Sequence, residues 1–289
     1  EYVERMEYPV VIKAEGLALG KGVVIAGDFN EARDALKAMM VDKVFGQAGL
    51  RVVIEEHLTG PEVSVLAFTD GKAVIPMVSA QDHKRAYDGD RGPNTGGMGA
   101  FSPSRVYTPD VAGEVEDCII RPTIRAMAEE GRPFKGVLYF GLMLTPQGPR
   151  VLEYNARFGD PETQVVLPRL KTDIVDIFEA VIDGNLDEIK VEWEDNAAVC
   201  VVLASGGYPR SYRTGYEISG IEEALRDPDI MVFHAGTKKA DGKYYTSGGR
   251  VLGVTAVAKD LDAAIKKAYQ GVERIRFENM HYRRDIGKR

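Results

Sequence analysis

Residues 151–164 read Val-Leu-Glu-Tyr-Asn-Ala-Arg-Phe-Gly-Asp-Pro-Glu-Thr-Gln, which joins an apolar strand to a charged turn and the start of a helix. Alternate side chains of a strand point to the same face, so Glu153 and Asn155 are predicted to lie together and offer oxygen ligands. Mg²⁺ prefers such ligands and commonly takes one or two carboxylates together with phosphates. With Arg157 nearby and Pro161 suited to the first helical position, the segment predicts a metal site. The alternative is an ordinary polar face of an edge strand.

The sequence around this segment predicts an α+β chain with about two folding units in its 289 residues. The dipeptide Asp70-Gly71 is typical of a two-residue hairpin turn, and Pro122 is predicted to kink a helix. The region 82–103 contains five glycines and is predicted to be a long functional loop. Predicted strands cover residues 8–13, 23–25, 51–56, 63–68, 73–78, 137–144, 150–155, 198–204, 231–235 and 251–257, and predicted helices fall within 28–45, 108–131, 172–182 and 261–275.

Composition and charge exclude several classes of protein. Acidic residues outnumber basic ones by 44 to 37, so the net charge is -7, which argues against a general nucleic-acid or membrane-surface binder. Cys118 and Cys200 form neither a disulfide framework nor a zinc-like cluster, which favours a reduced, cytoplasmic setting. No apolar run approaches the roughly 18 residues of a membrane span. The chain lacks an initiator Met, and we expect a fragment.

A glycine-rich segment lies between the first two predicted strands. Residues 15–22 read Glu-Gly-Leu-Ala-Leu-Gly-Lys-Gly, in which Gly20 and Gly22 let the backbone approach a phosphate and Lys21 adds charge. This is not a Walker loop, because neither Ser nor Thr follows the lysine. Lys13, at the end of an apolar strand, would be costly to bury without an anionic partner. A solvated hairpin and a lysine whose charge reaches water are the alternatives.

Two further segments carry polar groups in places suited to ligand binding. Residues 55–62 read Glu-Glu-His-Leu-Thr-Gly-Pro-Glu, and their carboxylates and backbone groups suit an adenine amine and ribose hydroxyls. An acidic solvated turn is the alternative there. The region 82–99 combines cations with glycines, which suits recognition of an oxyanion. The four histidines receive no catalytic role.

Taken in order, these segments resemble the ATP-grasp ligases, and among them the glycinamide ribonucleotide synthetase (phosphoribosylamine–glycine ligase) family of purine biosynthesis. The resemblance spans essentially the whole chain. It is carried by residues 13–16 with 20–22, by 55–62, 81–85, 92–99 and 153–164, and by 247–252 in the part that corresponds to the family's final domain.

The resemblance implies an ATP-grasp fold in which two α+β subdomains hold ATP, followed by a small mixed α/β domain. We expect a small subdomain over 1–62, a large subdomain over 63–190 and a carboxyl-terminal domain over 191–289. It implies ATP-dependent ligation of glycine to 5-phosphoribosylamine through glycyl phosphate, with Mg²⁺ or Mn²⁺ as the metal. Neither a nucleic acid nor a membrane is expected as a partner.

The family also implies roles for individual residues. Lys13 and Arg157 are expected to act in catalysis, and Glu153 and Asn155 to bind the metal. The expected nucleotide-binding residues are Lys13, Gly20, Lys21, Gly22, Glu55, Glu56, Leu58 and Glu62, and the expected substrate-binding residues are Asp82, Lys84, Asn94, Gly97, Arg157 and Asp160.

Family members begin with a further domain of about one hundred residues that helps to hold phosphoribosylamine. We expect this amino-terminal domain as a partner, and the present chain alone is expected to be inactive in the complete reaction. Two alternatives stay open, namely another ATP-grasp carboxylate–amine ligase and a non-catalytic nucleotide-binding fragment.

Overall fold

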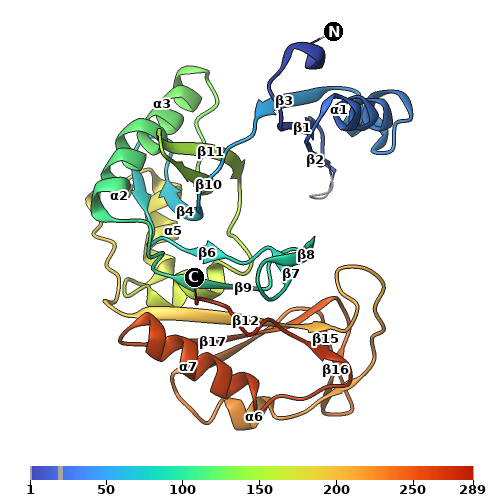
Figure 1. The fold of residues 1–289 in the computed structure, drawn as a ribbon. Helices are drawn as coiled ribbons and strands as arrows, with labels where there is room; N and C mark the ends of the chain where they lie inside the picture. Colours follow the sequence, from blue (N-terminus) through green and yellow to red (C-terminus); the bar gives the residue numbers. More distant parts are fainter. Residues whose placement is uncertain (1, 19–21, 289) are drawn as a thin grey trace. The chain divides into compact units, whose positions relative to one another are not determined.

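The structure is a computed structural model that describes residues 2–18 and 22–288 (Figure 1). The chain divides into two compact units, Glu1–Gly60 and Pro61–Arg289. Each unit has hydrophobic clusters of its own. The expected subdomain boundaries at 62/63 and 190/191 stay predictions.

The first unit is a three-stranded antiparallel sheet with one helix. Its strand order is β2-β1-β3, and the predicted strands are confirmed. Asp28 caps the helix by accepting a hydrogen bond from the Glu31 N–H at 2.9 Å. The elements are β1 (Val10–Ala14), β2 (Val23–Ala26), β3 (Val52–Glu56) and α1 (Phe29–Leu36), with a π-helical turn at Lys37–Val41 and 3-10 turns at Val3–Arg5 and Gly46–Gly49.

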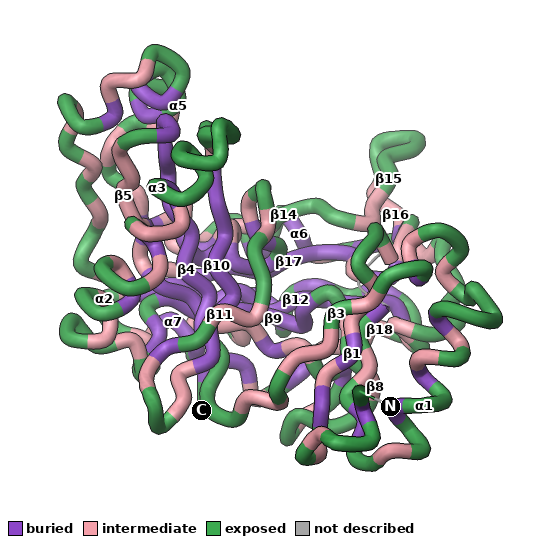
Figure 2. The backbone as a smooth tube through the Cα atoms, turned by 90° about the horizontal axis from the view of Figure 1, so that it is seen from above, coloured by how far each residue is buried: buried purple, intermediate pink, exposed green. Residues whose placement is uncertain are grey.

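The second unit contains a four-stranded antiparallel sheet, in the order β11-β10-β4-β5, that is buried on both faces. Val65 and Phe140 face one core, whereas Leu66 and Tyr139 face another, because the strand period is two. The β4 and β10 strands are accordingly almost continuous runs of buried residues (Figure 2). The strands are β4 (Glu62–Thr69), β5 (Val74–Pro76), β10 (Gly136–Thr145) and β11 (Gly148–Asn155). Strand β4 pairs antiparallel with β5, as the hairpin predicted at Asp70-Gly71 requires, and β10 pairs antiparallel with β11.

Helices cover the two faces of this sheet. One face packs on α2 (Pro109–Val115) and α3 (Arg121–Glu129), and the other on α5 (Ile174–Asp183). Thr108 caps α2, because its side chain accepts a hydrogen bond from the Val111 N–H. The irregularity predicted at Pro122 lies slightly earlier, where Glu116–Ile120 forms a π-helical turn. Pro122 follows this turn, as the second residue of α3.

A second, six-stranded sheet joins the carboxyl-terminal residues to the middle of the chain. The order β14-β17-β12-β9-β6 is completed by β18, which pairs with β12. The strands are β6 (Gln81–Asp82), β9 (Gly99–Ser102), β12 (Ala197–Ser205), β14 (Ile230–His234), β17 (Arg250–Ala258) and β18 (Met280–His281). Strands β6 and β9, which precede β10 in sequence, therefore belong to the same sheet as the carboxyl-terminal strands.

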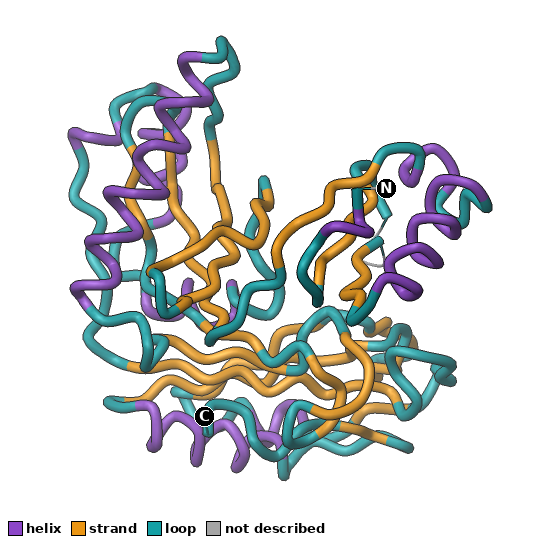
Figure 3. The backbone as a smooth tube through the Cα atoms, turned by 45° about the horizontal axis from the view of Figure 1, so that its top comes forward, coloured by secondary structure: helices purple, strands orange, loops and turns teal. Residues whose placement is uncertain are grey.

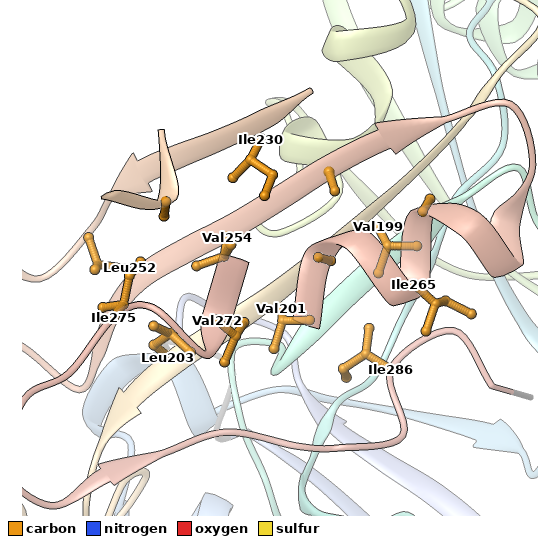
Figure 4. Close-up of a cluster of buried hydrophobic side chains, with 14 of the residues drawn as sticks. Val199, Val201, Leu203, Ile230, Leu252, Val254, Ile265, Val272, Ile275 and Ile286 are labelled. Carbon is orange, nitrogen blue, oxygen red and sulfur yellow. The ribbon is translucent and has the colours of Figure 1, made fainter. Parts of the chain in front are cut away.

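The central strand β12 is buried along its whole length because it serves two cores. Val199, Val201 and Leu203 face α7 (Leu261–Val272), where they pack with residues of β17 (Figure 4). Ala198 and Cys200 point the other way, into the core that also contains Leu66 of β4. Helix α7 lies across one face of the sheet (Figure 3).

The expected long loop at 82–103 is wrong in one respect, because these residues contain short strands. Two of them, β7 (Arg85–Tyr87) and β8 (Arg91–Asn94), form a hairpin, and β6 and β9 belong to the six-stranded sheet. The strands are stabilised by distant partners, which a local pattern does not reveal. The remaining elements are β13 (Glu217–Ile218), β15 (Thr237–Ala240), β16 (Lys243–Thr246), α4 (Thr163–Val166) and α6 (Ile221–Ala224).

Both cysteines are free, Cys118 exposed and Cys200 buried. Across residues 2–18 and 22–288, no helix is long and apolar enough to cross a membrane.

Candidate functional site

The first unit presents one face of its sheet with an ion pair at its centre. Val10 and Ile12 of β1 point into the core, so Val11 and Lys13 point to the opposite face. The Lys13 ammonium lies 2.6 Å from a Glu55 carboxylate oxygen. The structure therefore brings together two of the predicted nucleotide-binding residues.

Aliphatic side chains surround this pair, and the sequence reasoning did not assign them to the site. Val23 and Val53 are the cross-strand neighbours of Lys13, and Ile25 is that of Val11. Val23, Ile25 and Val53 are 51%, 57% and 44% exposed, so the face is apolar and open in this unit. Such a face can pack against a planar base while Lys13 meets a phosphate. Strand alternation at 23–25 and 52–55 is the sequence signal that would have revealed it.

The other predicted nucleotide-binding residues are more dispersed. Gly20 and Lys21 lie outside the described residues. Gly22 is buried, and its carbonyl accepts a hydrogen bond from the Ala14 N–H at 2.8 Å. Glu56 is exposed at the end of β3, and Leu58 is half-buried in the following segment.

In the second unit, the predicted metal-binding residues are neighbours at the end of β11. The Asn155 side-chain amide donates a hydrogen bond to a Glu153 carboxylate oxygen at 3.2 Å. Both side chains lie on one face, as the period of two predicts. Carboxylate and amide oxygens are hard ligands suited to Mg²⁺. Within the described residues, no group of three or more His, Cys, Asp or Glu could hold a metal ion, so this pair would need phosphate or water oxygens to complete a coordination shell.

Lys84 sits among the carboxylates of three residues of this unit. It pairs with Glu62, and Asp82, Glu62 and Glu153 all attract its ammonium. Burial alone would lower the pKa of Lys84, but these carboxylates hold it above its ordinary value. Lys84 therefore carries a positive charge at neutral pH. Glu62, which is expected to bind the nucleotide, forms an ion pair with Lys84.

Asp82 has an unusual environment for a carboxyl group. Burial raises the pKa of Asp82 to about 7, the Lys84 ammonium opposes this rise, and the Glu162 and Glu62 carboxylates add to it. The surrounding cluster of Glu62, Asp82, Glu153 and Glu162 with Lys84 carries an excess of negative charge.

Glu162 of this cluster also belongs to a buried hydrogen-bond network that was not predicted from the sequence. Glu162 is 4% exposed and accepts hydrogen bonds from the Tyr139 hydroxyl at 3.0 Å and the Ser64 hydroxyl at 3.2 Å. Burial and the Glu162 charge raise the pKa of Tyr139, so its hydroxyl remains a neutral donor. A Cβ on Gly159 would lie 2.5 Å from Glu162, so the Glu162 side chain also supports the turn that follows Arg157. Glu162 stood in the quoted sequence segment, but its burial depends on strands far away in sequence.

The remaining predicted substrate-binding residues lie in two segments, at 94–97 and at 157–160. Arg157 is exposed and donates to the Phe158 carbonyl at 2.8 Å. Asp160 forms an ion pair at 3.0 Å with Arg250, which no sequence argument assigned to the site. Asn94 is exposed on β8, and Gly97, with φ +109°, is packed so closely on Pro161 that a Cβ would lie 2.4 Å from the ring.

Solved structures with low sequence identity establish the fold class. The biotin carboxylase domain of Hydrogenobacter thermophilus 2-oxoglutarate carboxylase, solved with MgADP, ADP and bicarbonate, is 16% identical. It aligns with a TM-score of 0.68 over 97% of this chain and 60% of that one. The chain therefore shares the fold of this domain.

Family models and close relatives define the position within this class. Residues 1–163 match the phosphoribosylglycinamide synthetase ATP-grasp (A) domain, and residues 198–289 match the C domain of the same enzyme. The phosphoribosylamine–glycine ligase of Clostridium acetobutylicum is 53% identical over all of this chain and 68% of its own length. The trifunctional purine biosynthetic protein adenosine-3 of Gallus gallus is 51% identical over all of this chain and 29% of its own length.

A solved relative agrees with these matches. The crystal structure of the phosphoribosylamine–glycine ligase from Thermotoga maritima is 36% identical and has a TM-score of 0.88, over 98% of this chain and 70% of that one. The chain belongs to the phosphoribosylglycinamide synthetase family, and it carries the ATP-grasp and C domains of a ligase of purine biosynthesis. It spans about two thirds of the length of the bacterial ligases that it matches, from 64% to 68% in the first three.

Proposed function

We propose that this chain carries out the ATP-dependent part of glycine ligation to 5-phosphoribosylamine. A glycine carboxylate oxygen attacks the γ-phosphorus of ATP, and the bond to the β-phosphate oxygen breaks to give glycyl phosphate and ADP. The amine nitrogen of phosphoribosylamine then attacks the glycyl carbonyl carbon, phosphate leaves, and the nitrogen loses a proton. The products are glycinamide ribonucleotide, ADP and phosphate. No covalent bond to the protein is needed.

The residues of the first unit suit the nucleotide. The aliphatic sheet face packs against adenine, and Lys13, with Glu55 as its partner in the absence of ligand, meets the phosphates. Gly20, Lys21 and Gly22 would supply N–H groups and a further charge. Charge neutralisation of a transferring phosphoryl group is the main contribution that a protein makes to such a reaction.

The residues of the second unit suit the metal and glycine. Glu153 and Asn155 would hold Mg²⁺ or Mn²⁺, which when bound neutralises phosphate charge. The acidic cluster around Lys84 attracts the ammonium group of glycine, and Arg157 meets the acyl phosphate. The observation that carries this proposal is the direct contact of Glu153 with Asn155 beside the Lys84 cluster, inside the segment that matches the A-domain model.

About a third of the length of the relatives lies outside the match. We propose that this part contributes to binding of phosphoribosylamine, so the complete reaction is tested on the complete enzyme. Nucleotide and metal binding can be tested on the present chain.

Calorimetric titration with a non-hydrolysable ATP analogue, with and without Mg²⁺, tests the nucleotide and metal assignment. We expect Mg²⁺ to strengthen binding, and Glu153→Gln to weaken the metal-dependent binding about tenfold, since one charged ligand is lost. Glu179→Gln, on the exposed face of α5, is the matched control and should bind like the unmodified chain. Equal affinities for the Glu153 and Glu179 variants would contradict the metal assignment.

A further inference from the structure

Arg250 joins the carboxyl-terminal part of the second unit to two segments that the proposed function uses. It is the first residue of β17, and its side chain is 21% exposed. One guanidinium nitrogen, Nη1, donates to the Gly96 carbonyl at 2.6 Å and to the Asp160 carbonyl at 2.9 Å. The other, Nη2, donates to the Asp160 carboxylate at 3.0 Å. The planar guanidinium therefore spans both segments, as an ammonium could not in the same geometry.

The Gly96 peptide is held from both sides by the carboxyl-terminal part. While Arg250 binds the Gly96 carbonyl, the Gly96 N–H donates to the Tyr208 hydroxyl at 3.0 Å. The Tyr208 ring packs directly on Gly249, where a Cβ would lie 2.3 Å from it. The next residue, Gly97, packs on Pro161. The backbone at 96–97 consequently has little freedom to move.

Hydrogen bonds continue from this backbone to Lys84. The N–H and the hydroxyl of Thr95 both donate to the Lys84 carbonyl at 2.8 Å, and the Gly97 N–H donates back to the Thr95 hydroxyl at 3.0 Å. On the other side, Asp160 lies three residues after Arg157. Arg250 is thus linked through the 95–97 backbone to the Lys84 carbonyl, and its partner Asp160 lies three residues along the chain from Arg157.

We propose that Arg250 is a positioning residue for the ligation site. Its hydrogen bonds fix residues 95–97 relative to Asp160, and they thereby fix the positions of Lys84 and of the turn that contains Arg157. We call this set of hydrogen bonds to Gly96 and Asp160 the Arg250 clamp. This inference rests on the proposed function for its catalytic consequence. The clamp itself is a property of the fold and can be measured without substrate. Small displacements of positioned groups cost large factors in rate, so the clamp should matter more for ligation than for folding.

The first test is kinetic and uses the complete enzyme. We expect Arg250→Gln to raise the KM for glycine and lower kcat, with a combined loss of about a hundredfold in kcat/KM. The affinity for the ATP analogue with Mg²⁺ should stay within about twofold, and the melting temperature within about 4 °C. Arg250→Lys should recover part of the activity. Asp160→Asn added to Arg250→Gln should cost less than the product of the two single effects, because both act on one contact.

A matched control is available in the same part of the chain. Arg274 donates one hydrogen bond from Nη1 to the Glu223 carbonyl at 2.9 Å and is exposed. Arg274→Gln should leave the KM for glycine, kcat and kcat/KM unchanged. Kinetics of Arg250→Gln equal to those of Arg274→Gln would overturn the proposal. A parallel fall in nucleotide affinity and melting temperature would also overturn it, since it would indicate general destabilisation.

Hydrogen exchange separates failure of this inference from failure of the proposed function. In the absence of substrate, amides of residues 94–97 should exchange at least tenfold faster in Arg250→Gln than in the unmodified enzyme, while α7 should be unchanged. Unchanged exchange at 94–97 would overturn the clamp whatever the activity. Absence of glycine-dependent ATP consumption by the unmodified enzyme would contradict the proposed function and leave the exchange test to decide the clamp.

Discussion

Arg283 shows how much one buried side chain contributes to holding the β7–β8 hairpin on the carboxyl-terminal part. Its guanidinium is fully buried and lies 2.8 Å from both Asp90 and Asp285, and it also donates to the Arg85 carbonyl at 3.1 Å. Arg283→Met removes the buried guanidinium that pairs with Asp90 and with the half-buried Asp285, so we expect a loss of about 3 kcal/mol in the free energy of unfolding. Urea denaturation measures it. Arg284→Met, at the exposed neighbour, should cost under about 0.5 kcal/mol, and equal losses would contradict the assignment.

The same network predicts a pH dependence. Burial alone would raise the pKa of Asp285, but hydrogen bonds from Arg283 and the Gly89 N–H, together with the Arg283 charge, hold it well below its usual range. A carboxyl group with a lowered native pKa stabilises the fold above its unfolded pKa of about 3.9, and this contribution disappears as the pH falls toward the native pKa. The destabilisation caused by Asp285→Asn should therefore be constant above about pH 5 and shrink below about pH 4. A penalty that stays constant down to pH 3 would contradict it.

Arg157 should affect chemistry rather than stability. It is exposed, and the proposed role places it at the acyl phosphate. Arg157→Ala should raise the KM for glycine and lower kcat by about tenfold each, because one charge that neutralises the transferring group is lost. Steady-state kinetics of the complete enzyme measure both parameters. Arg125→Ala, on the exposed side of α3, is the control and should leave the KM for glycine and kcat unchanged. An unchanged KM and kcat in Arg157→Ala would contradict the role proposed for Arg157.

The same Gly→Ala substitution should lower the stability of the protein at one glycine, in a loop, and raise it at another, in a helix. Gly97→Ala places a Cβ 2.4 Å from Pro161, at a residue whose φ is +109°. We therefore expect the free energy of unfolding to fall by about 2 kcal/mol and most of the activity to be lost. Gly113 lies within α2, and a Cβ there would have nothing within 4 Å. Gly113→Ala should stabilise the protein by about 0.5–1 kcal/mol, because alanine favours the helix. Thermal and urea denaturation measure both, and a stable, active Gly97→Ala variant would show that the loop adapts.

Elements with a strong local pattern could be predicted from the sequence. The hairpin of β4 and β5 follows from Asp70-Gly71, whose Asp70 carboxylate accepts the Lys72 and Ala73 N–H groups at 2.9 and 2.8 Å. The short strands in 82–103 could not, because β9 is stabilised by pairing with β12, as at Phe101 and Val199. Such pairs depend on the whole topology and leave no local period.

The candidate site divides in the same way. The neighbouring positions of Glu153 and Asn155 follow from the strand period alone. By contrast, Arg250 meets Asp160 across 90 positions of sequence, and Glu162 is buried only because Ser64 and Tyr139 arrive on other strands. Residue type and spacing thus predict which groups of one segment act together, and only the fold shows which segments meet.

At the scale of the whole chain, the number of cores determines what unfolds together. Strand β12 contributes to two cores of the second unit, so the cores that flank it share a strand and its backbone hydrogen bonds. The buried residues of the first unit form a separate cluster of their own, around Ile12 and Met39. Local stability follows such cooperative units rather than sequence distance.

A pair of cavity-forming substitutions tests this division. Leu203→Ala on β12 and Ile12→Ala on β1 each remove a fully buried side chain and should cost about 2–5 kcal/mol within their own unit. In native-state hydrogen exchange, Leu203→Ala should raise the exchange rates of the slowest amides of β12, β9 and β10 by a common factor. The reason is that the six-stranded sheet, with β12 and β9, and the four-stranded sheet, with β10, share a core, so that opening one sheet opens this core. Ile12→Ala should accelerate only the amides of β1, β2 and β3. If Leu203→Ala changed β12 and left β10 at its original rate, the carboxyl-terminal part would be an independent folding unit, and the role of β12 as the strand common to both cores would be wrong.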